Sequence, residues 1–281
     1  MKTVKCCLAV LLLNISVMAQ NIKVMTYNLR VEVRSDTVNG WDNRKEALTT
    51  LVRFYGPDIM GTQEGLDNQL SYISDGIEGF EFVGHGRTDG GSAGEYSAIF
   101  YKSTKFDIIM DSTFWLSQTP EKPSRGWDAA YDRVCTYALL KDKETGNSFW
   151  VFNTHLDNKG TEARLNGSRL ITECIDAVIQ DNPYPVILTG DMNCEENDDP
   201  IKHFTGKLND SRKISLKEPY GPAGTFNGFE FWSPLAQRID YILVSKNNVE
   251  ITNYYSIDDR YANNKWPSDH LPVMVELNLR Y

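Results

Sequence analysis

The chain has 281 residues, of which 41% are hydrophobic and 24% are charged, and its formal net charge is −9. This length is enough to bury the core of one large α/β domain, and the composition is that of a globular protein without low-complexity tracts. An acidic surface does not attract polyanions over a distance, so the charge argues against a protein that binds duplex DNA nonspecifically.

The first 19 residues have the order of an export signal. Two lysines precede an apolar run at residues 8–13, and Val17-Met18-Ala19 supplies small residues at a cleavage site. The apolar run is too short to span a bilayer. We therefore expect a cleaved signal peptide over residues 1–19. The mature protein, residues 20–281, is expected to be periplasmic or secreted, monomeric and without a membrane span.

After the signal, short β-rich runs alternate with amphipathic stretches, and no linker divides the chain, so residues 20–281 are expected to form a single domain. In the first strand Ile22 and Val24 share a face, and Asn182-Pro183 stops the longest helix. In chain order, the expected elements are a strand at 22–28, a helix at 42–55, strands at 98–101 and 149–154, a helix at 161–180, and strands at 186–189, 239–244 and 271–277.

Two long segments between these elements, 117–132 and 217–234, are rich in aromatic residues, among them Trp127 and Phe226. Long loops of this kind are often functional, although a single aromatic side chain more commonly packs onto the core. The mature chain has three cysteines, Cys135, Cys174 and Cys194, without metal-ligand spacing. One disulfide is compatible with them, and at least one thiol lacks a partner within the chain.

Polar side chains stand where most of the apolar runs stop. The ends of strands in an α/β fold converge on one rim, which is where such folds build ligand sites. Glu64 belongs to this set because it follows the apolar pair Ile59-Met60, and Asp240 belongs to it because it interrupts an apolar run. The candidate site residues are Asn28, Glu64, His155, Asp191, Asn193, Asp240, Asp269 and His270.

These residue types suit the hydrolysis of a phosphate ester. The four carboxylates are hard oxygen ligands or bases that favour Mg²⁺ or Mn²⁺ over softer metals. The two histidines can donate to phosphoryl oxygens or transfer a proton, and the two asparagines can orient a carboxylate, a phosphate or the attacking water. Hydrolysis requires a positioned water, neutralised oxygens and help for the leaving group, and this set supplies all three.

Each motif alone has another explanation. The tetrapeptide Gly190-Asp191-Met192-Asn193 fits a turn with a capping carboxylate, residues 268–270 fit a loop before a strand, and His155 fits a core histidine. Asp240 differs from these, because a carboxylate between Ile239 and Tyr241 is costly to bury unless something uses it.

Taken together and in order, six motifs resemble the endonuclease/exonuclease/phosphatase superfamily, which has the DNase I-like fold. The resemblance runs from about Ile22 to the C-terminus, and residues 86–101 are similar to a branch of exported bacterial metal-dependent hydrolases. The motifs are Thr26-Tyr27-Asn28, Thr62-Gln63-Glu64, Asn153-Thr154-His155-Leu156-Asp157, Gly190-Asp191-Met192-Asn193, Arg238-Ile239-Asp240-Tyr241-Ile242 and Ser268-Asp269-His270.

The resemblance implies a four-layer α/β/β/α sandwich, with two packed, mainly antiparallel sheets, helices outside and the site at one end. By position it implies Glu64 as the principal Mg²⁺ ligand, supported by Asn28 and, through water, by Asp269. It implies that Asp191 orients or deprotonates the attacking water and that Asn193 holds the phosphate.

The same resemblance implies that His270 donates to the phosphoryl oxygen while Asp240 fixes its tautomer. It makes His155, paired with Glu95, a second phosphate donor or acid. It also implies, from a more variable loop, that Arg133 helps to neutralise the phosphate.

The sequence departs from a duplex nuclease because no dense Lys/Arg loop is present. We therefore predict an exported Mg²⁺-dependent phosphoesterase that hydrolyses a phosphodiester in a small or single-stranded nucleotide-type substrate, whose base or ring stacks on Trp127 and Phe226. One alternative is a phosphomonoesterase, or a phospholipase of the sphingomyelinase type, acting on sugar, inositol or lipid phosphates. A further alternative is a catalytically silent protein that binds a ligand on the same scaffold.

Overall fold

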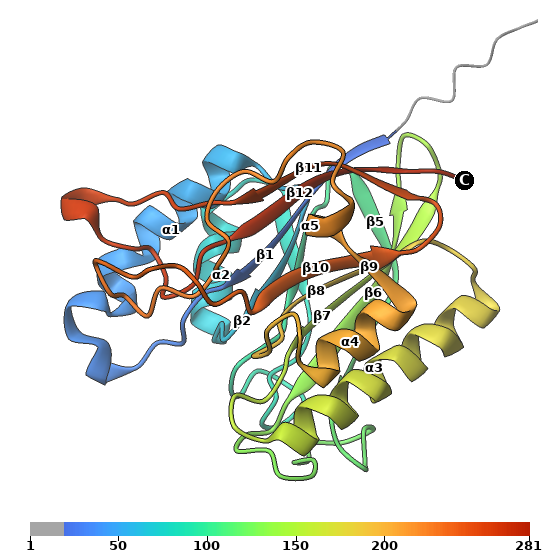
Figure 1. Cartoon of the computed structure of the whole chain (residues 1–281), viewed down its shortest axis with the longest axis horizontal. Helices are drawn as coiled ribbons and strands as arrows, with labels where there is room; N and C mark the ends of the chain where they lie inside the picture. The colour runs from blue at the N-terminus through green and yellow to red at the C-terminus, as the bar shows by residue number, and fades with distance from the viewer. Residues whose placement is uncertain (1–19) are drawn as a thin grey trace, which may run out of the picture.

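The computed structural model describes residues 20–281, so the expected signal peptide at residues 1–19 lies outside the described residues. Two six-stranded sheets pack face to face, and helices cover the outer face of each sheet (Figure 1). This arrangement confirms the four-layer sandwich. The pairs β1–β2 and β7–β8 run parallel, and the other strand pairs run antiparallel.

The first sheet contains both the first and the last described strands, which lie side by side. In spatial order its strands are β11 (Val249–Ser256), β12 (Val273–Leu279), β1 (Gln20–Asn28), β2 (Ile59–Gln63), β4 (Ile99–Lys102) and β3 (Phe80–Val83). The second sheet consists of β5 (Phe106–Trp115), β6 (Val134–Asp142), β7 (Ser148–His155), β8 (Val186–Asp191), β10 (Asp240–Ser245) and β9 (Leu208–Asp210).

The helices lie on opposite outer faces of the sandwich (Figure 1). The first sheet is covered by α1 (Trp41–Tyr55) and α2 (Asp67–Gly76). The second is covered by α3 (Thr161–Asp181) and α4 (Asp199–Lys207). The shorter helices are α5 (Ser211–Ile214), η1 (Arg34–Asn39) and η2 (Ala262–Asn264). No helix among residues 20–281 is long and apolar enough to cross a membrane.

Strand alternation divides the apolar side chains into three buried layers. In β1, Ile22 and Val24 face the layer between the two sheets, whereas Met25 and Tyr27 face the helices. Successive side chains of a strand point to opposite faces, so one strand supplies two layers. α1 buries a stripe that includes Leu48, and the helix ends where Gly56 takes the left-handed conformation, with φ 58°.

The expected elements all form, and their ends differ from the expectation by at most two residues. The last strand starts at Val273 rather than at residue 271, because Pro272 has no backbone N–H to donate to the ladder. The remaining elements were not predicted from the sequence: strands β2, β3, β5, β6, β9 and β11 and helices α2, α4, α5, η1 and η2. Cys135, Cys174 and Cys194 are free thiols in the described chain.

A buried polar network joins the two sheets near the end of the sandwich where the candidate residues lie. The side chain of Asn153 donates to the carbonyls of Thr62 and Ala98 at 2.7 and 2.8 Å, and its Oδ1 accepts from Gln63 at 2.8 Å. Gly61 allows this approach, because a Cβ there would lie 2.1 Å from Thr189 Oγ1. A satisfied network of this kind fixes one relative position of the sheets.

Arg44 is a completely buried cation that holds several segments through their backbone carbonyls. Its guanidinium donates to Leu29 O and Arg30 O, both at 2.5 Å, and to Pro267 O at 3.2 Å. These carbonyls flank Asn28 on one side and Ser268-Asp269-His270 on the other. Arg44 on α1 therefore fixes the distance between the end of β1 and the loop that precedes β12.

Asp58 forms a second structural centre, at the other end of β1. Its carboxylate accepts the backbone N–H of Lys23 at 3.0 Å and the ammonium groups of Lys102 and Lys105 at 3.0 and 2.9 Å. Burial alone would raise the pKa of Asp58, but these donors outweigh it and hold the pKa below its ordinary value. The folded state therefore favours the charged form of this carboxylate.

We expect Asp58→Asn to lower the free energy of unfolding by about 2 kcal/mol at pH 7, since hydrogen bonds to a charged group are lost. The folded pKa is depressed, so this contribution is complete above the unfolded pKa of about 4 and disappears as pH falls through the folded value. Urea unfolding of both proteins at pH 7 and pH 3 measures the difference. An equal difference at the two pH values would contradict this account.

Candidate active site

The ends of several strands bring the candidate residues to one edge of the sandwich. β1 and β2 are parallel, and so are β7 and β8, while Asp240 at the start of β10 pairs in register with Asp191 at the end of β8. A cleft of about 480 Å³ opens at this edge. The predicted residues that line it are Glu64, Glu95, Arg133, His155, Asp191, Asn193, Phe226, Asp269 and His270.

Asn28 and Asp240 lie below the cleft rather than on its surface, and both are completely buried. Trp127 is the one predicted residue that does not belong to the lining of the cleft or to this buried layer. Trp127 therefore lies outside the lining of the cleft, and its stacking on the substrate stays a prediction. Its neighbour Tyr131, which the sequence analysis did not select, lines the cleft instead.

Two of the site residues have an unusual backbone. Glu64 has φ 63° and Asn193 has φ 46°, in the left-handed region that residues with a side chain rarely adopt. Each such conformation costs about 1–3 kcal/mol, and strain of this kind clusters at functional sites. In both cases the turn comes directly after a strand end and directs a polar side chain into the cleft.

Asn28 connects two carboxylates. Its Nδ2 donates to Glu64 Oε1 at 3.1 Å and to Asp191 Oδ2 at 2.9 Å. Its Oδ1 accepts the backbone N–H of Arg30 at 3.0 Å, and Val31 N donates to Glu64 Oε2 at 2.9 Å. Asn28 was expected to support the metal. In the structure its amide orients Glu64 and Asp191.

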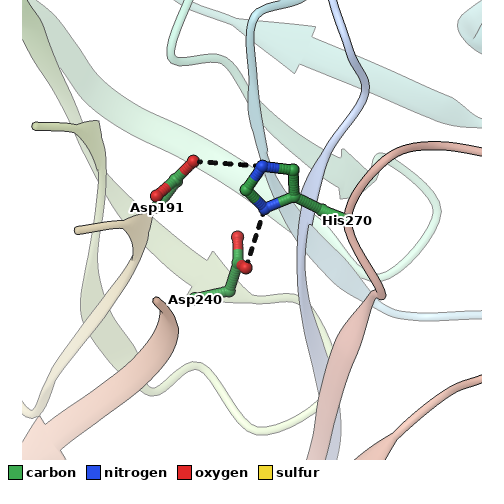
Figure 2. A group of neighbouring side chains, drawn as sticks. All are labelled: Asp191, Asp240 and His270. Carbon is green, nitrogen blue, oxygen red and sulfur yellow. Dashed lines mark hydrogen bonds and ion pairs between the residues drawn. The ribbon is translucent and has the colours of Figure 1, made fainter. Parts of the chain in front are cut away.

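His270 lies between two aspartates (Figure 2). Its Nδ1 is 2.9 Å from Asp240 Oδ2, and its Nε2 is 3.6 Å from Asp191 Oδ2. Burial by itself would lower the pKa of His270, but the flanking carboxylates Asp240 and Asp191 hold it well above its ordinary value. The two carboxylates therefore favour the protonated form of His270, and Asp240 holds its Nδ1.

Asp191 is the most connected group of the site. Besides Asn28 and His270, its carboxylate accepts the backbone N–H of Asn193 at 2.9 Å, and His155 Nε2 lies 3.5 Å away. Burial and the neighbouring Asp240 raise the pKa of Asp191, although His270 acts in the opposite direction. A carboxylate with a raised pKa in a cleft is suited to accept a proton near neutral pH.

His155 is not paired with Glu95. Its Nε2 contacts the side-chain amide of Asn193 at 3.0 Å, whereas Glu95 Oε1 accepts from Arg87 at 2.7 Å. Burial and the nearby charges of Arg133 and Arg87 lower the pKa of His155 well below its ordinary value. His155 is therefore neutral at pH 7, and the expected partnership with Glu95 is replaced by an ion pair that the sequence did not predict.

The oxygen ligands of the site fit a hard divalent cation. Glu64 and Asp269 both line the cleft. Burial, and also the negative charge of Glu64, raise the pKa of Asp269. Asp191, Asp240 and His270 also lie close enough to form a possible metal site. In that group His270 lies between the two carboxylates and contacts both of them. Glu64 and Asp269 supply oxygen ligands of the kind that a hard cation prefers.

Arginines supply the positive charge of the cleft. Arg133 is buried, its Nε bonds Asp157 at 3.3 Å, and its NH1 has no partner among the described residues. The guanidinium carbons of Arg87 and Arg133 lie 5.3 and 5.5 Å from the ring centre of Tyr131. An unpaired donor on a buried cation in a cleft is suited to a phosphoryl oxygen.

Sequence reasoning missed Arg30, Arg87 and Tyr131, which all line the cleft. Arg87 lies within the segment that carries the resemblance to bacterial hydrolases, and Tyr131 stands two residues before Arg133. Phe226 contacts the edge of the His270 ring, with ring centres 5.1 Å apart, so the second predicted stacking residue does reach the site.

Known proteins resemble this chain over nearly its whole length. The Endonuclease/Exonuclease/phosphatase family matches residues 25–270. A family protein of Bacteroides thetaiotaomicron is 38% identical, with a TM-score of 0.88, and the alignment covers 93% of this chain and 96% of that one. A mannosyl-6-phosphatase of the same species is also 38% identical, with a TM-score of 0.87 and coverage of 91% and 99%.

A more distant relative is mouse nocturnin, which is 23% identical over 265 residues. That alignment covers 85% of this chain but only 58% of nocturnin, so the chain spans little more than half of that relative. The family match, the near-complete coverage of the Bacteroides structures and the convergence of the six motifs on one cleft agree with one another. The chain belongs to the endonuclease/exonuclease/phosphatase family, whose members are phosphoester hydrolases.

Proposed function

We propose that this protein is an Mg²⁺-dependent phosphatase that hydrolyses the phosphate monoester of a small molecule, with a sugar phosphate as the first candidate. The observation that carries this proposal is the unpaired NH1 of buried Arg133 in the same cleft as Glu64 and Asp269. A terminal phosphate carries more negative charge than a diester, and a cation site and arginines in one cleft of about 480 Å³ suit it.

The relative described as a mannosyl-6-phosphatase supports a sugar phosphate, since it is 38% identical over nearly all of its length. The net charge of −9 gives the protein as a whole no long-range attraction for a polyanionic polymer. These two points favour the monoester, which was the alternative in the sequence analysis, over the phosphodiester predicted first.

In the proposed mechanism, Asp191 accepts a proton from the attacking water, which its raised pKa allows, and hydrogen bonds from Asn28 and Asn193 N hold its carboxylate in place. As the water oxygen bonds to phosphorus, the bond from phosphorus to the ester oxygen breaks. The leaving alkoxide takes up a proton from solvent and departs as the alcohol, which balances the proton that Asp191 accepted. The imidazolium of His270 donates from Nε2 to a phosphoryl oxygen, while Asp240 holds Nδ1. When bound at Glu64 and Asp269, a divalent cation supplies charge neutralisation of the phosphoryl oxygens.

A phosphodiester in a nucleotide-type substrate is the second candidate. The observation that favours it is Phe226, whose ring lines the cleft next to His270 and can stack on a base. A phospholipase activity and a catalytically silent binding protein are further alternatives, which the same experiment separates.

The test measures hydrolysis of a panel of phosphate esters by residues 20–281. The panel contains mannose 6-phosphate, a chromogenic mono-ester and bis-ester, single-stranded RNA and DNA, and sphingomyelin, each with Mg²⁺ or with EDTA. Turnover of the mono-esters that disappears with EDTA and in Glu64→Ala supports the proposal. Faster turnover of a diester selects the second candidate, and absence of turnover on every ester favours a binding protein.

We also propose that the enzyme acts outside the cytoplasm, because residues 1–19 have the order of a cleaved export signal. Mass spectrometry of the full-length chain, expressed in a Gram-negative host and recovered from the periplasm, measures the start of the mature protein. A mature chain that begins near Gln20 supports export, and an uncleaved chain retained in the cytoplasm contradicts it.

A further inference from the structure

An ion pair in the wall of the cleft has no part in the mechanism described above. Arg87 NH2 and Glu95 Oε1 are 2.7 Å apart, and their side chains are only 13% and 19% exposed. The pair has therefore lost much of its contact with water, and burial raises the pKa of Glu95. A desolvated pair of this kind contributes little to stability, so its place in the cleft calls for another explanation.

The loop that carries the pair is rigid. Arg87 N donates to Glu95 O at 3.0 Å, and Trp115 Nε1 donates to Arg87 O at 2.7 Å. Asp89 Oδ1 accepts the N–H groups of Gly91 and Ala93 at 2.8 and 3.0 Å. Both side chains therefore hold their position before a ligand arrives, which reduces the entropy lost on binding.

The pair is neutral as a whole but keeps unused hydrogen-bonding capacity. Among the described residues, Arg87 and Glu95 share one side-chain hydrogen bond, which leaves further guanidinium N–H groups and the second oxygen of the carboxylate. A second phosphate would be repelled by Glu95. Sugar hydroxyl groups are neutral, and each of them can donate and accept, so they match a neighbouring donor and acceptor.

We propose that Arg87 and Glu95 bind hydroxyl groups of the substrate's leaving group and thereby make the enzyme selective for phosphates of polyhydroxylated rings. This inference rests on the proposed phosphatase function. Arg133, with its unpaired NH1, binds the phosphate. The ring of Tyr131 packs against the guanidinium groups of both Arg87 and Arg133, so each arginine binds a different part of the substrate. Arg87 and Glu95 are specificity residues for the part of the substrate that does not react.

The test compares two substrates that match in size, mannose 6-phosphate and cyclohexylmethyl phosphate, which lacks the hydroxyl groups. We expect the wild type to prefer the sugar in kcat/KM by about tenfold or more, since hydrogen bonds to charged groups are lost with the analogue. Arg87→Gln and Glu95→Gln should each reduce that preference about tenfold, mainly through KM for the sugar. The matched control is Arg125→Gln, which breaks the exposed Arg125–Asp132 pair at 3.0 Å and should leave the preference unchanged.

A second measurement begins with the wild-type protein, so its first result does not depend on the folding of a variant. Mannose 6-phosphates that lack one hydroxyl at a time should include at least one with kcat/KM reduced about tenfold, and Arg87→Gln should not add to that loss. Hydrolysis of both matched substrates at equal rates by the wild type would overturn this inference and leave the phosphatase function intact. Hydrolysis of neither substrate would overturn both.

Discussion

Replacement of Asp240 by Asn should lower kcat about 10³-fold and leave the fold intact. The carboxylate holds Nδ1 of His270 at 2.9 Å and keeps the ring protonated, so an amide removes both the charge and the fixed tautomer. Loss of a positioned acid of this type costs about 10²–10⁴ in rate. Steady-state kinetics on the best ester of the panel, together with the melting temperature, measures the effect.

Three further variants complete that experiment. His270→Ala should lose a similar factor, and the double variant should be no worse than the poorer single variant, because the two residues act as one unit. His203→Ala provides the control, since His203 bonds Thr172 on the α3–α4 face, away from the cleft. If Asp240→Asn and His270→Ala both kept kcat within twofold of the wild type, the assigned pair would be incorrect.

Glu64→Gln should abolish binding of Mg²⁺ in a calorimetric titration and lower kcat/KM by about 10³-fold or more. The substitution keeps the shape of the side chain and one of its two acceptor oxygens, so one of the hydrogen bonds from Asn28 Nδ2 and Val31 N is lost while the local fold should persist. What is lost is the negative charge that a hard cation requires. Glu173→Gln, on the exposed surface of α3, is the matched control.

Calorimetry separates two explanations for any loss of activity in Glu64→Gln. Unchanged Mg²⁺ affinity together with low activity would move the cation away from Glu64, to the group of Asp191, Asp240 and His270. Loss of both binding and activity agrees with a cation held by Glu64 and Asp269.

The chemistry-bearing residues could be predicted because they stand where apolar strands stop. Asp240 is the clearest case: a carboxylate among apolar neighbours in a strand is expensive unless a partner is present, and the structure supplies His270. The sandwich was predicted from the resemblance of the six motifs, and strand alternation accounts for its layers, since the two faces of β1 supply two different ones.

Contacts that depend on loop conformation could not be predicted. Glu95 was expected beside His155, but it accepts a hydrogen bond from Arg87 instead. The conformation of the loop brings these two residues together, and the hydrophobic periodicity of the sequence does not predict that conformation. In the sequence, Arg44 has the position of an ordinary helix residue. In the structure it is buried and donates to the carbonyls of Leu29 and Pro267, which are far apart in the chain. Trp127 and Tyr131 belong to one aromatic loop, and only the fold decides which of them faces the cleft.

The pairing of β1 with β12 has a consequence for the order in which the protein becomes active during synthesis. β12 lies between β1 and β11, so β1 lacks one of its two neighbours until residues 273–279 have been made. His270 precedes β12 by only three residues. The ribosome must therefore release residues 270–279 before the sheet can close and His270 can reach Asp240. A nascent or prematurely terminated chain thus has neither a complete sheet nor hydrolytic activity.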